Sequence, residues 1–201
     1  MTLTVSLEAF PSPKRNFEES GPQRIVLGGG CFWCTEAVYL ELEGVLSVTS
    51  GYAGDREALA NYDKVCSGLT NHAEVIEIRY DSDRISLGEL LQLFFSVAHD
   101  PTQLDRQGND RGRQYRSVVF WESEQQRDFV RDYIHQLDRD MVHDAPIVTT
   151  LEPLEAFYPA EEYHQDFASR NPTQPYIQFA ALPKVHKLRE HFPEKLRGGG
   201  K

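Results

Sequence analysis

The order of its strand and helix patterns is the feature that most restricts the fold of this 201-residue chain. Strands are expected where apolar residues alternate or run together, and helices where they recur every three to four residues. The sequence predicts strands at residues 24–27, 45–52, 73–80, 117–121 and 146–151. It predicts helices at residues 32–43, from Ser86, from Ser123, and from about 183 to 196. The β-α-β, β-α-β, α-β order is typical of a ferredoxin-like split βαβ core, so we expect a two-layer α+β sandwich with a mostly antiparallel sheet.

Two of the predicted helices begin with the pattern of a capping box. Ser86 precedes Glu89 by three residues, and Ser123 precedes Gln126 by the same spacing. In a capping box the serine hydroxyl and the later Glu or Gln side chain satisfy each other's free backbone N–H groups. We therefore expect both helices to begin immediately after these serines.

The chain is expected to form one domain with short extensions. Residues 1–22 lack periodicity and are predicted to be an arm that is poorly ordered or packed on the surface, whereas residues 23–197 form the domain and 198–201 a flexible tail. Inside the domain, residues 55–72 and 99–116 are long, polar and rich in turn residues. Loops of that length in a compact domain are usually functional.

The charge and cysteine content exclude several classes of protein. The formal net charge is −10, which argues against nucleic acid or an anionic membrane surface as a partner. No apolar run is long enough to span a membrane, and the basic pair Lys14-Arg15 stands after the first apolar residues instead of before them, unlike a secretory signal. Three cysteines, two of them three residues apart, fit a reducing compartment. We expect a cytoplasmic protein that is a monomer.

The segment from Gly28 to Cys34 is the main indication of function. Three glycines end the strand after Leu27, and the helix that follows places Cys31 at or near its N-terminus. Free N–H groups and the helix dipole favour a thiolate there, so the sequence predicts a lowered pKa and a reactive Cys31. The rings of Phe32 and Trp33 are expected to form an apolar pocket beside the sulfur.

A carboxyl group is expected on the apolar side of one strand. Glu74 shares its face with Ile76, Ile78 and Tyr80. Burial there would raise the pKa of Glu74 and make it a general acid or hydrogen-bond donor. The alternative is a carboxylate that reaches solvent at the strand end or pairs with an arginine.

Three further polar residues lie in the two long loops. Tyr62, Asp110 and Tyr115 could meet a ligand there, although loop tyrosines more often pack across a surface. None of the three would define a site by itself.

Taken together, these residues lie in segments that resemble the type A peptide methionine sulfoxide reductases. The matching segments, in order, are Gly30-Cys31-Phe32-Trp33, Gly51-Tyr52, residues 62–68, His72-Ala73-Glu74, Tyr80-Asp81, His99-Asp100-Pro101, residues 106–110, residues 114–117 and residues 160–165. An ordered series over most of residues 25–180 is far more specific than any single motif. The resemblance implies a catalytic domain at residues 23–197 that reduces the S-epimer of methionine sulfoxide, free or in proteins, to methionine and so repairs oxidative damage.

The resemblance also implies a role for each site residue. Cys31 is the nucleophile, and its attack leaves a sulfenic acid. The remaining roles are binding of the S-methyl group by Phe32 and Trp33, binding and protonation of the sulfoxide oxygen by Glu74, Tyr62 and Tyr115, and support of the loop or of a bound water by Asp110. No bound cofactor or metal is implied; the reductant is external, thioredoxin or a small dithiol.

The thiol that reduces the sulfenic acid is left open by the sequence. Many relatives have glycine where this chain has Cys34, which lies one helical turn from Cys31 and could form a disulfide with it. Similar sequences often carry a distal cysteine at the position that corresponds to Ile177 in this chain. Cys66 is a second candidate, and direct reduction by an external thiol is the third possibility. The residues before Tyr62 also depart from the usual pattern, which puts its placement in doubt.

Two other functions fit parts of the pattern. A Cys-x-x-Cys pair at a helix start suits a general dithiol–disulfide oxidoreductase, but that chemistry has no use for Glu74 or the tyrosines. Cys31, Cys34, Cys66 and His72 have the side chains of a structural zinc site, but their spacing is looser than in common zinc motifs. Bound zinc would also silence the nucleophile.

Overall fold

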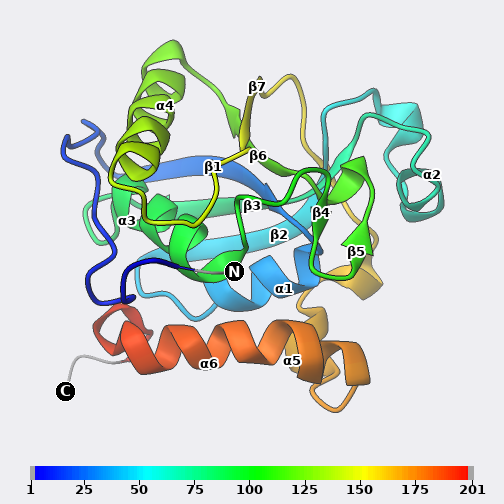
Figure 1. The fold of residues 1–201 in the computed structure, drawn as a ribbon. Helices are drawn as coiled ribbons and strands as arrows, with labels where there is room; N and C mark the ends of the chain where they lie inside the picture. The colour runs from blue at the N-terminus through cyan, green and yellow to red at the C-terminus, as the bar shows by residue number, and fades with distance from the viewer. Residues whose placement is uncertain (1–2, 199–201) are drawn as a thin grey trace.

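A six-stranded sheet lies at the centre of the protein, whose computed structural model describes residues 3–198 (Figure 1). The strands in spatial order are β7 (Thr150–Pro153), β6 (Ser117–Trp121), β1 (Pro22–Gly29), β3 (Ala73–Asp81), β2 (Val45–Ala53) and β8 (Tyr158–Pro159). Neighbouring strands are antiparallel, except that β6 and β7 are parallel. The four strands β6-β1-β3-β2 reproduce the split βαβ arrangement. The predicted α+β fold class is therefore confirmed.

Helices pack against this sheet and against one another. The longer ones are α1 (Phe32–Tyr39), α3 (Leu87–Leu93) with its continuation η2 (Phe94–Ala98), α4 (Glu124–Arg139), and η5 (Ile177–Ala181) with its continuation α6 (Leu182–His191). In Figure 1, α6 runs alongside α1 on the side of α1 away from the sheet, and α1 contacts both η5 and α6. Helix α1 is thus enclosed between the sheet and the C-terminal helix.

Short elements fill the two long loops and the stretch before η5. They are η1 (Glu57–Leu59), α2 (Tyr62–Cys66), the hairpin β4 (Arg106–Gln107) and β5 (Asp110–Arg111), η3 (Arg113–Tyr115), η4 (Glu162–His164), α5 (Phe167–Arg170) and η6 (Pro193–Lys195). Figure 1 shows α2 and the β4–β5 hairpin at the same end of the sheet, near the start of α1. None of the helices within residues 3–198 has the length and apolar character needed to cross a bilayer.

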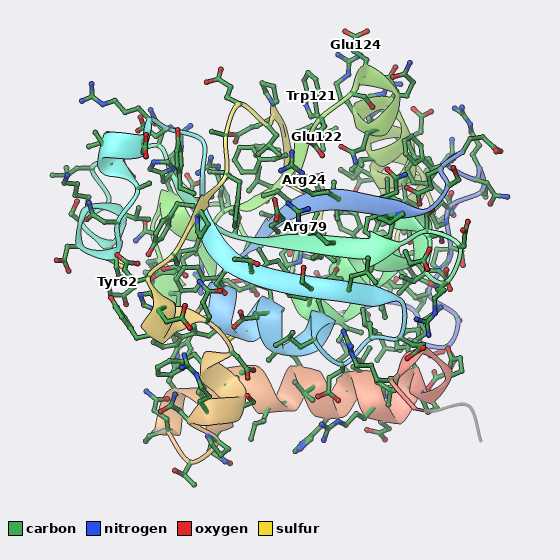
Figure 2. The ribbon with its side chains drawn as sticks, turned by 180° about the vertical axis from the view of Figure 1, so that it is seen from behind. Arg24, Tyr62, Arg79, Trp121, Glu122 and Glu124 are labelled. Carbon is green, nitrogen blue, oxygen red and sulfur yellow. The ribbon has the colours of Figure 1, made fainter. Side chains whose placement is uncertain are left out.

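The two faces of β3 contact different surroundings. Ile76, Ile78 and Tyr80 join the main core under the helices, whereas Val75 belongs to a smaller apolar cluster on the opposite face. On that opposite face Glu77 accepts hydrogen bonds from two arginines, Arg24 and Arg79, each at 3.0 Å. Figure 2 labels both arginines over the strands of the sheet. Strict alternation along β3 therefore directs Glu74 toward the helix side.

The largest differences from the predicted boundaries occur in three elements. Helix α1 ends at Tyr39 instead of residue 43, because Glu41 and Leu42 turn more tightly toward Gly44, whose φ is +85°. Strand β7 begins at Thr150, since Ile147 bonds to the Asp138 side chain instead of to a strand. The last helix, α6, ends at His191, and a separate turn, η6, follows Pro193.

The two predicted capping boxes also differ. Ser86 and Glu89 form the complete reciprocal pair at the start of α3. Ser123 accepts a hydrogen bond from the backbone N–H of Gln126, but the Gln126 side chain accepts from Glu122 instead of from Ser123. The helix starts are as predicted, whereas the second box is only half formed.

The N-terminal arm is packed along the helix side. Leu7 and Phe10 are buried in the main core. The arm's backbone accepts hydrogen bonds from three helix side chains, Gln92 of α3 and Tyr133 and Gln136 of α4. Residues 1–2 of the predicted arm and residues 199–201 of the predicted tail lie outside the described part of the chain.

Candidate active site

The turn from β1 into α1 places Cys31 at the helix start. Cys31 is the N-cap of α1, and its carbonyl oxygen accepts hydrogen bonds from the N–H groups of Cys34 and Thr35 at 3.1 and 3.4 Å. Gly30 precedes it with φ +89°, a left-handed conformation that favours glycine. A Cβ on Gly30 would also lie 2.6 Å from Gln107 Cβ in the facing hairpin. The glycine thus allows both the turn and the close approach of the loop.

Substitution of Gly30 by alanine is expected to destabilise the fold. The variant combines backbone strain with a clash against Gln107, so we expect a loss of roughly 2 kcal/mol or more in the free energy of unfolding. The matched control is Gly68→Ala, because Gly68 also has positive φ (+71°) but nothing within 4 Å of an added Cβ. The control should lose about 1 kcal/mol from strain alone. Urea unfolding of both variants separates the two effects, and equal losses would contradict the close approach.

A cavity of about 230 Å³ opens beside Cys31. It is lined by Cys31, Phe32, Trp33, Tyr62, Glu74, Asp110, Tyr115, Gln174 and Tyr176. Every site residue named from the sequence except Cys34 therefore borders one small cavity, although these residues come from five separate segments. Figure 2 labels Tyr62 at the same end of the sheet as α2.

Glu74 is buried at the base of this cavity, with only 2% of its surface exposed. One of its carboxyl oxygens accepts a hydrogen bond from the backbone N–H of Phe32 at 3.1 Å. Burial raises the pKa of Glu74 to about 8. The hydrogen bond from Phe32 opposes this rise, whereas the nearby Asp110 adds to it. Glu74 therefore carries its proton at neutral pH, as its position on the strand predicts.

This buried carboxyl is expected to make stability depend on pH. Its folded-state pKa of about 8 exceeds the ordinary glutamate value of 4.5, so the folded protein retains a proton that the unfolded chain releases. Wild-type stability is therefore expected to fall as pH rises from about 4.5 to 8. Glu74→Gln removes this contribution, so its stability relative to wild type should increase with pH across that interval. Urea unfolding at pH 5, 7 and 9 measures the difference, and parallel curves would contradict the burial argument.

The two thiols at the start of α1 form a hydrogen-bonded pair. The Cys31 thiol donates to the Cys34 sulfur, the Cys34 thiol donates to the Tyr176 hydroxyl at 3.9 Å, and the Tyr176 hydroxyl donates to Asp110. Cys31 is partly exposed, whereas Cys34 is 2% exposed. The chain of donors runs from the accessible sulfur through the buried one to a carboxylate.

The acidity of the pair differs from the sequence prediction. Burial raises the pKa of the Cys31 thiol well above its usual range, and Cys34 and Glu74 raise it further. The hydrogen bond from Cys31 lowers the pKa of Cys34 to about 7, and the charge of Lys184 adds to this lowering. The predicted lowering at Cys31 is therefore wrong: desolvation outweighs the helix terminus, and the first ionisation belongs to the pair of thiols as a whole.

Aromatic rings form one wall of the cavity. The Trp33 indole stacks on Phe167 of α5, with ring centroids 3.8 Å apart and planes inclined by 8°. Its Nε1–H donates a hydrogen bond to Nδ1 of His164 at 3.1 Å. The same histidine ring packs against Phe32 and Tyr62, and burial lowers the pKa of His164. A neutral His164 thus fixes the orientation of Trp33.

The two loop tyrosines also border the cavity. Tyr62 begins α2, and its backbone N–H donates to Glu161 at 3.0 Å. Tyr115 ends η3 and is followed by the buried Arg116, which forms a two-pronged ion pair with Glu152 at 2.9 and 3.0 Å. Burial raises the pKa of both Tyr62 and Tyr115, so both phenols keep their protons as donors. Tyr62 therefore lies on the cavity although the residues before it depart from the usual pattern.

Cys66 lies at the other end of α2, away from the thiol pair. It is partly exposed and is in hydrogen-bond contact with Tyr62 and Tyr115. Burial raises the pKa of Cys66. It does not line the cavity beside Cys31, whereas Cys34 is in direct contact with Cys31.

Tyr176 and Lys184 belong to the site, although the sequence did not indicate either residue. Tyr176 follows Gln174-Pro175, a segment whose only sequence signal was the missing cysteine at Ile177. Ile177 is buried in a cluster with Cys34, so an apolar contact occupies the place expected for a distal thiol. Among residues 3–198, no group of three or more His, Cys, Asp or Glu side chains is placed to hold a metal ion; His72 bonds to the Arg56 carbonyl oxygen instead.

Comparison with known proteins agrees with this site. Residues 23–196 match the family model described as peptide methionine sulfoxide reductase. The chain is 50% identical over 177 residues to a peptide methionine sulfoxide reductase MsrA 2 of Synechocystis sp., covering 88% of this chain and 83% of that protein. It is 52% identical over 170 residues to the MsrA of Natronomonas pharaonis, covering 85% and 95% of the two chains.

Solved structures show the same likeness. The crystal structure of reduced Mxr1 from Saccharomyces cerevisiae superposes with a TM-score of 0.68 at 32% identity, covering 83% of this chain and 94% of that one. Methionine sulfoxide reductase A of Corynebacterium diphtheriae gives a TM-score of 0.65 at 34% identity, with 78% of each chain covered. The chain therefore belongs to the peptide methionine sulfoxide reductase A family and is an oxidoreductase that acts on methionine sulfoxide.

Proposed function

We propose that the cavity beside Cys31 binds the S-epimer of methionine sulfoxide and transfers its oxygen to the Cys31 sulfur. The observation that carries this proposal is the placement of a protonated, buried Glu74 and a partly exposed thiol on the same 230 Å³ cavity. A sulfoxide oxygen is a poor leaving group until it is protonated, so the reaction needs an acid as well as a nucleophile. Neither group alone would suffice.

The substrate is oriented by the two sides of the cavity. Phe32 and Trp33 offer an apolar wall for the S-methyl group. Glu74, Tyr62 and Tyr115 offer three proton-bearing groups for the oxygen. Because oxygen, methyl and the side chain differ at the sulfur, a fixed pocket of this kind accepts one epimer. Asp110 holds the Tyr176 hydroxyl and so shapes the third side.

The first chemical step transfers one oxygen atom. The cysteine pair loses one proton near pH 7, and the remaining shared proton moves to Cys34 as the Cys31 sulfur attacks. The Glu74 proton passes to the sulfoxide oxygen, the substrate S–O bond breaks, and an S–O bond forms at the Cys31 sulfur. Methionine leaves, Cys31 becomes a sulfenic acid, and Glu74 becomes a carboxylate.

The second step forms a disulfide. The Cys34 sulfur attacks the Cys31 sulfenic acid, the Cys31–Cys34 bond forms, and water leaves. Cys34 is the resolving thiol in this proposal because it is already hydrogen-bonded to Cys31, whereas Cys66 contacts the tyrosines. An external dithiol such as thioredoxin or a small dithiol then restores both thiols, so no bound cofactor takes part. The three free cysteines fit a monomer in the reducing cytoplasm.

The experiment that tests this function is turnover of resolved epimers. Purified protein with excess dithiothreitol is supplied with the S- or R-sulfoxide of N-acetylmethionine amide. Formation of the reduced N-acetylmethionine amide is followed by chromatography. We expect turnover of the S-epimer and none of the R-epimer. Turnover of neither epimer, or of the R-epimer alone, would overturn the proposal.

A further inference from the structure

We propose that the regenerating dithiol attacks the Cys31 sulfur of the Cys31–Cys34 disulfide, and that Cys34 is the leaving thiolate, held beside Tyr176 and Lys184. This inference rests on the proposed function, because it needs the disulfide which that cycle forms. It assigns which sulfur the reductant meets and which residues stabilise the one released.

Access distinguishes the two sulfurs. Cys31 is partly exposed and borders two cavities: the 230 Å³ substrate cavity and a neighbouring one of about 480 Å³. Cys34 lines only the second cavity and is 2% exposed, packed in α1 against Ile177, Ala168 and Ala181. An attacking thiolate must approach along the line of the disulfide bond, which a packed sulfur does not permit. The accessible sulfur is therefore Cys31.

The surroundings of Cys34 suit a leaving thiolate. The Tyr176 hydroxyl lies 3.9 Å from its sulfur, and the Lys184 charge lowers the pKa of Cys34. Lys184 is held in place because its Nζ donates a hydrogen bond to the Ala98 carbonyl oxygen at 2.6 Å. The sulfur of lower pKa leaves faster in thiol–disulfide exchange. The accessibility of Cys31 and the charge of Lys184 beside Cys34 thus favour the same direction of cleavage.

The exchange balances as a two-electron reduction. The thiolate of the external dithiol forms a bond to the Cys31 sulfur, the Cys31–Cys34 bond breaks, and its electron pair stays on Cys34. The second thiol of the dithiol then attacks the external sulfur of the mixed disulfide. Cys31 is released with a proton, and the external dithiol leaves as a disulfide.

The first test traps the mixed disulfide. A Cys66→Ser protein is oxidised by one turnover of the S-epimer, and peptide mapping first verifies the Cys31–Cys34 bond. It is then mixed with excess thioredoxin whose second active-site cysteine is serine, quenched in acid and mapped again. We expect thioredoxin on Cys31 and a free Cys34. Thioredoxin on Cys34 would overturn only the assignment of the attacked sulfur, whereas absence of the Cys31–Cys34 bond before mixing would overturn the proposed recycling step and this inference together.

The second test measures the leaving-group site. Lys184→Met should slow the opening of the preformed disulfide by dithiothreitol about threefold or more. Loss of the lysine charge raises the pKa of Cys34, and a thiol of higher pKa is a poorer leaving group. The pKa of Cys34, followed by thiolate absorbance near 240 nm in the reduced variant, should rise in parallel. The matched control is Lys187→Met, one turn along α6, whose Nζ donates to the Ser96 carbonyl oxygen at 2.8 Å. Equal effects of the two variants on rate and pKa would contradict the role of Lys184.

Discussion

Cys31→Ser is expected to abolish reduction of the S-sulfoxide, with a loss of more than about 10⁴-fold in kcat/KM. A serine hydroxyl at the start of α1 is far less nucleophilic than a cysteine sulfur. It also cannot take up the sulfoxide oxygen, whereas a cysteine sulfur does so and becomes a sulfenic acid. Its smaller volume leaves the cavity open, so substrate still has room to enter. The measurement is methionine formation in the presence of dithiothreitol.

The two other cysteines provide the controls for this variant. Cys66→Ser should retain turnover, because Cys66 lies outside the cavity and away from the thiol pair. Cys34→Ser should retain the first turnover, since Cys31 still accepts the oxygen, but should depend on a small thiol for later ones. If Cys31→Ser kept full activity and one of the other two variants lost it, the nucleophile would be that other cysteine and not Cys31.

Glu74→Gln is expected to slow sulfoxide reduction by about 10²- to 10⁴-fold, the usual contribution of a general acid. Glutamine keeps the shape of the side chain and can still donate a hydrogen bond to the oxygen, but it cannot transfer a proton. The loss should appear in kcat more than in KM, because proton transfer matters in the transition state. Single-turnover methionine formation measures the chemical step without the contribution of recycling.

The pH profile gives this variant a second readout. In the wild type the cysteine pair must lose one proton, with a pKa of about 7, and Glu74 must keep its proton, with a pKa of about 8. We therefore expect a bell-shaped single-turnover profile with its maximum between these values. Glu74→Gln should remove the fall on the alkaline side and keep the rise on the acidic side. A variant that is slow but retains both limbs would show that another group supplies the proton.

Much of the fold was predictable because its signals are local. Alternation along β3 sets which of its side chains face the helices, and the Ser86–Glu89 pair fixes the start of α3. Boundaries were predicted less well where distant contacts decide them. Strand β7 begins late because the Asp138 side chain, from the end of α4, takes the N–H of Ile147.

The site was predictable as a set of residues but not as a set of contacts. The glycine-to-cysteine turn and the inward position of Glu74 follow from local pattern, and the resemblance to a known family supplied the tyrosines. The acidity of Cys31 was not predictable, because its desolvation arises only when α1 packs against the C-terminal segment. Tyr176 carried no signal for the same reason: its hydroxyl meets Asp110, 66 residues away along the chain.

Thiol counting after a single turnover tests the central claim most directly. Reduced wild type and Cys34→Ser are each mixed with an excess of S-sulfoxide without reductant, and methionine and free thiols are measured after denaturation. The account predicts one methionine per chain in both, with loss of two thiols in wild type and one in Cys34→Ser. Loss of two thiols in Cys34→Ser would transfer the resolving role to Cys66, and methionine formation without loss of any thiol would contradict oxygen transfer to Cys31.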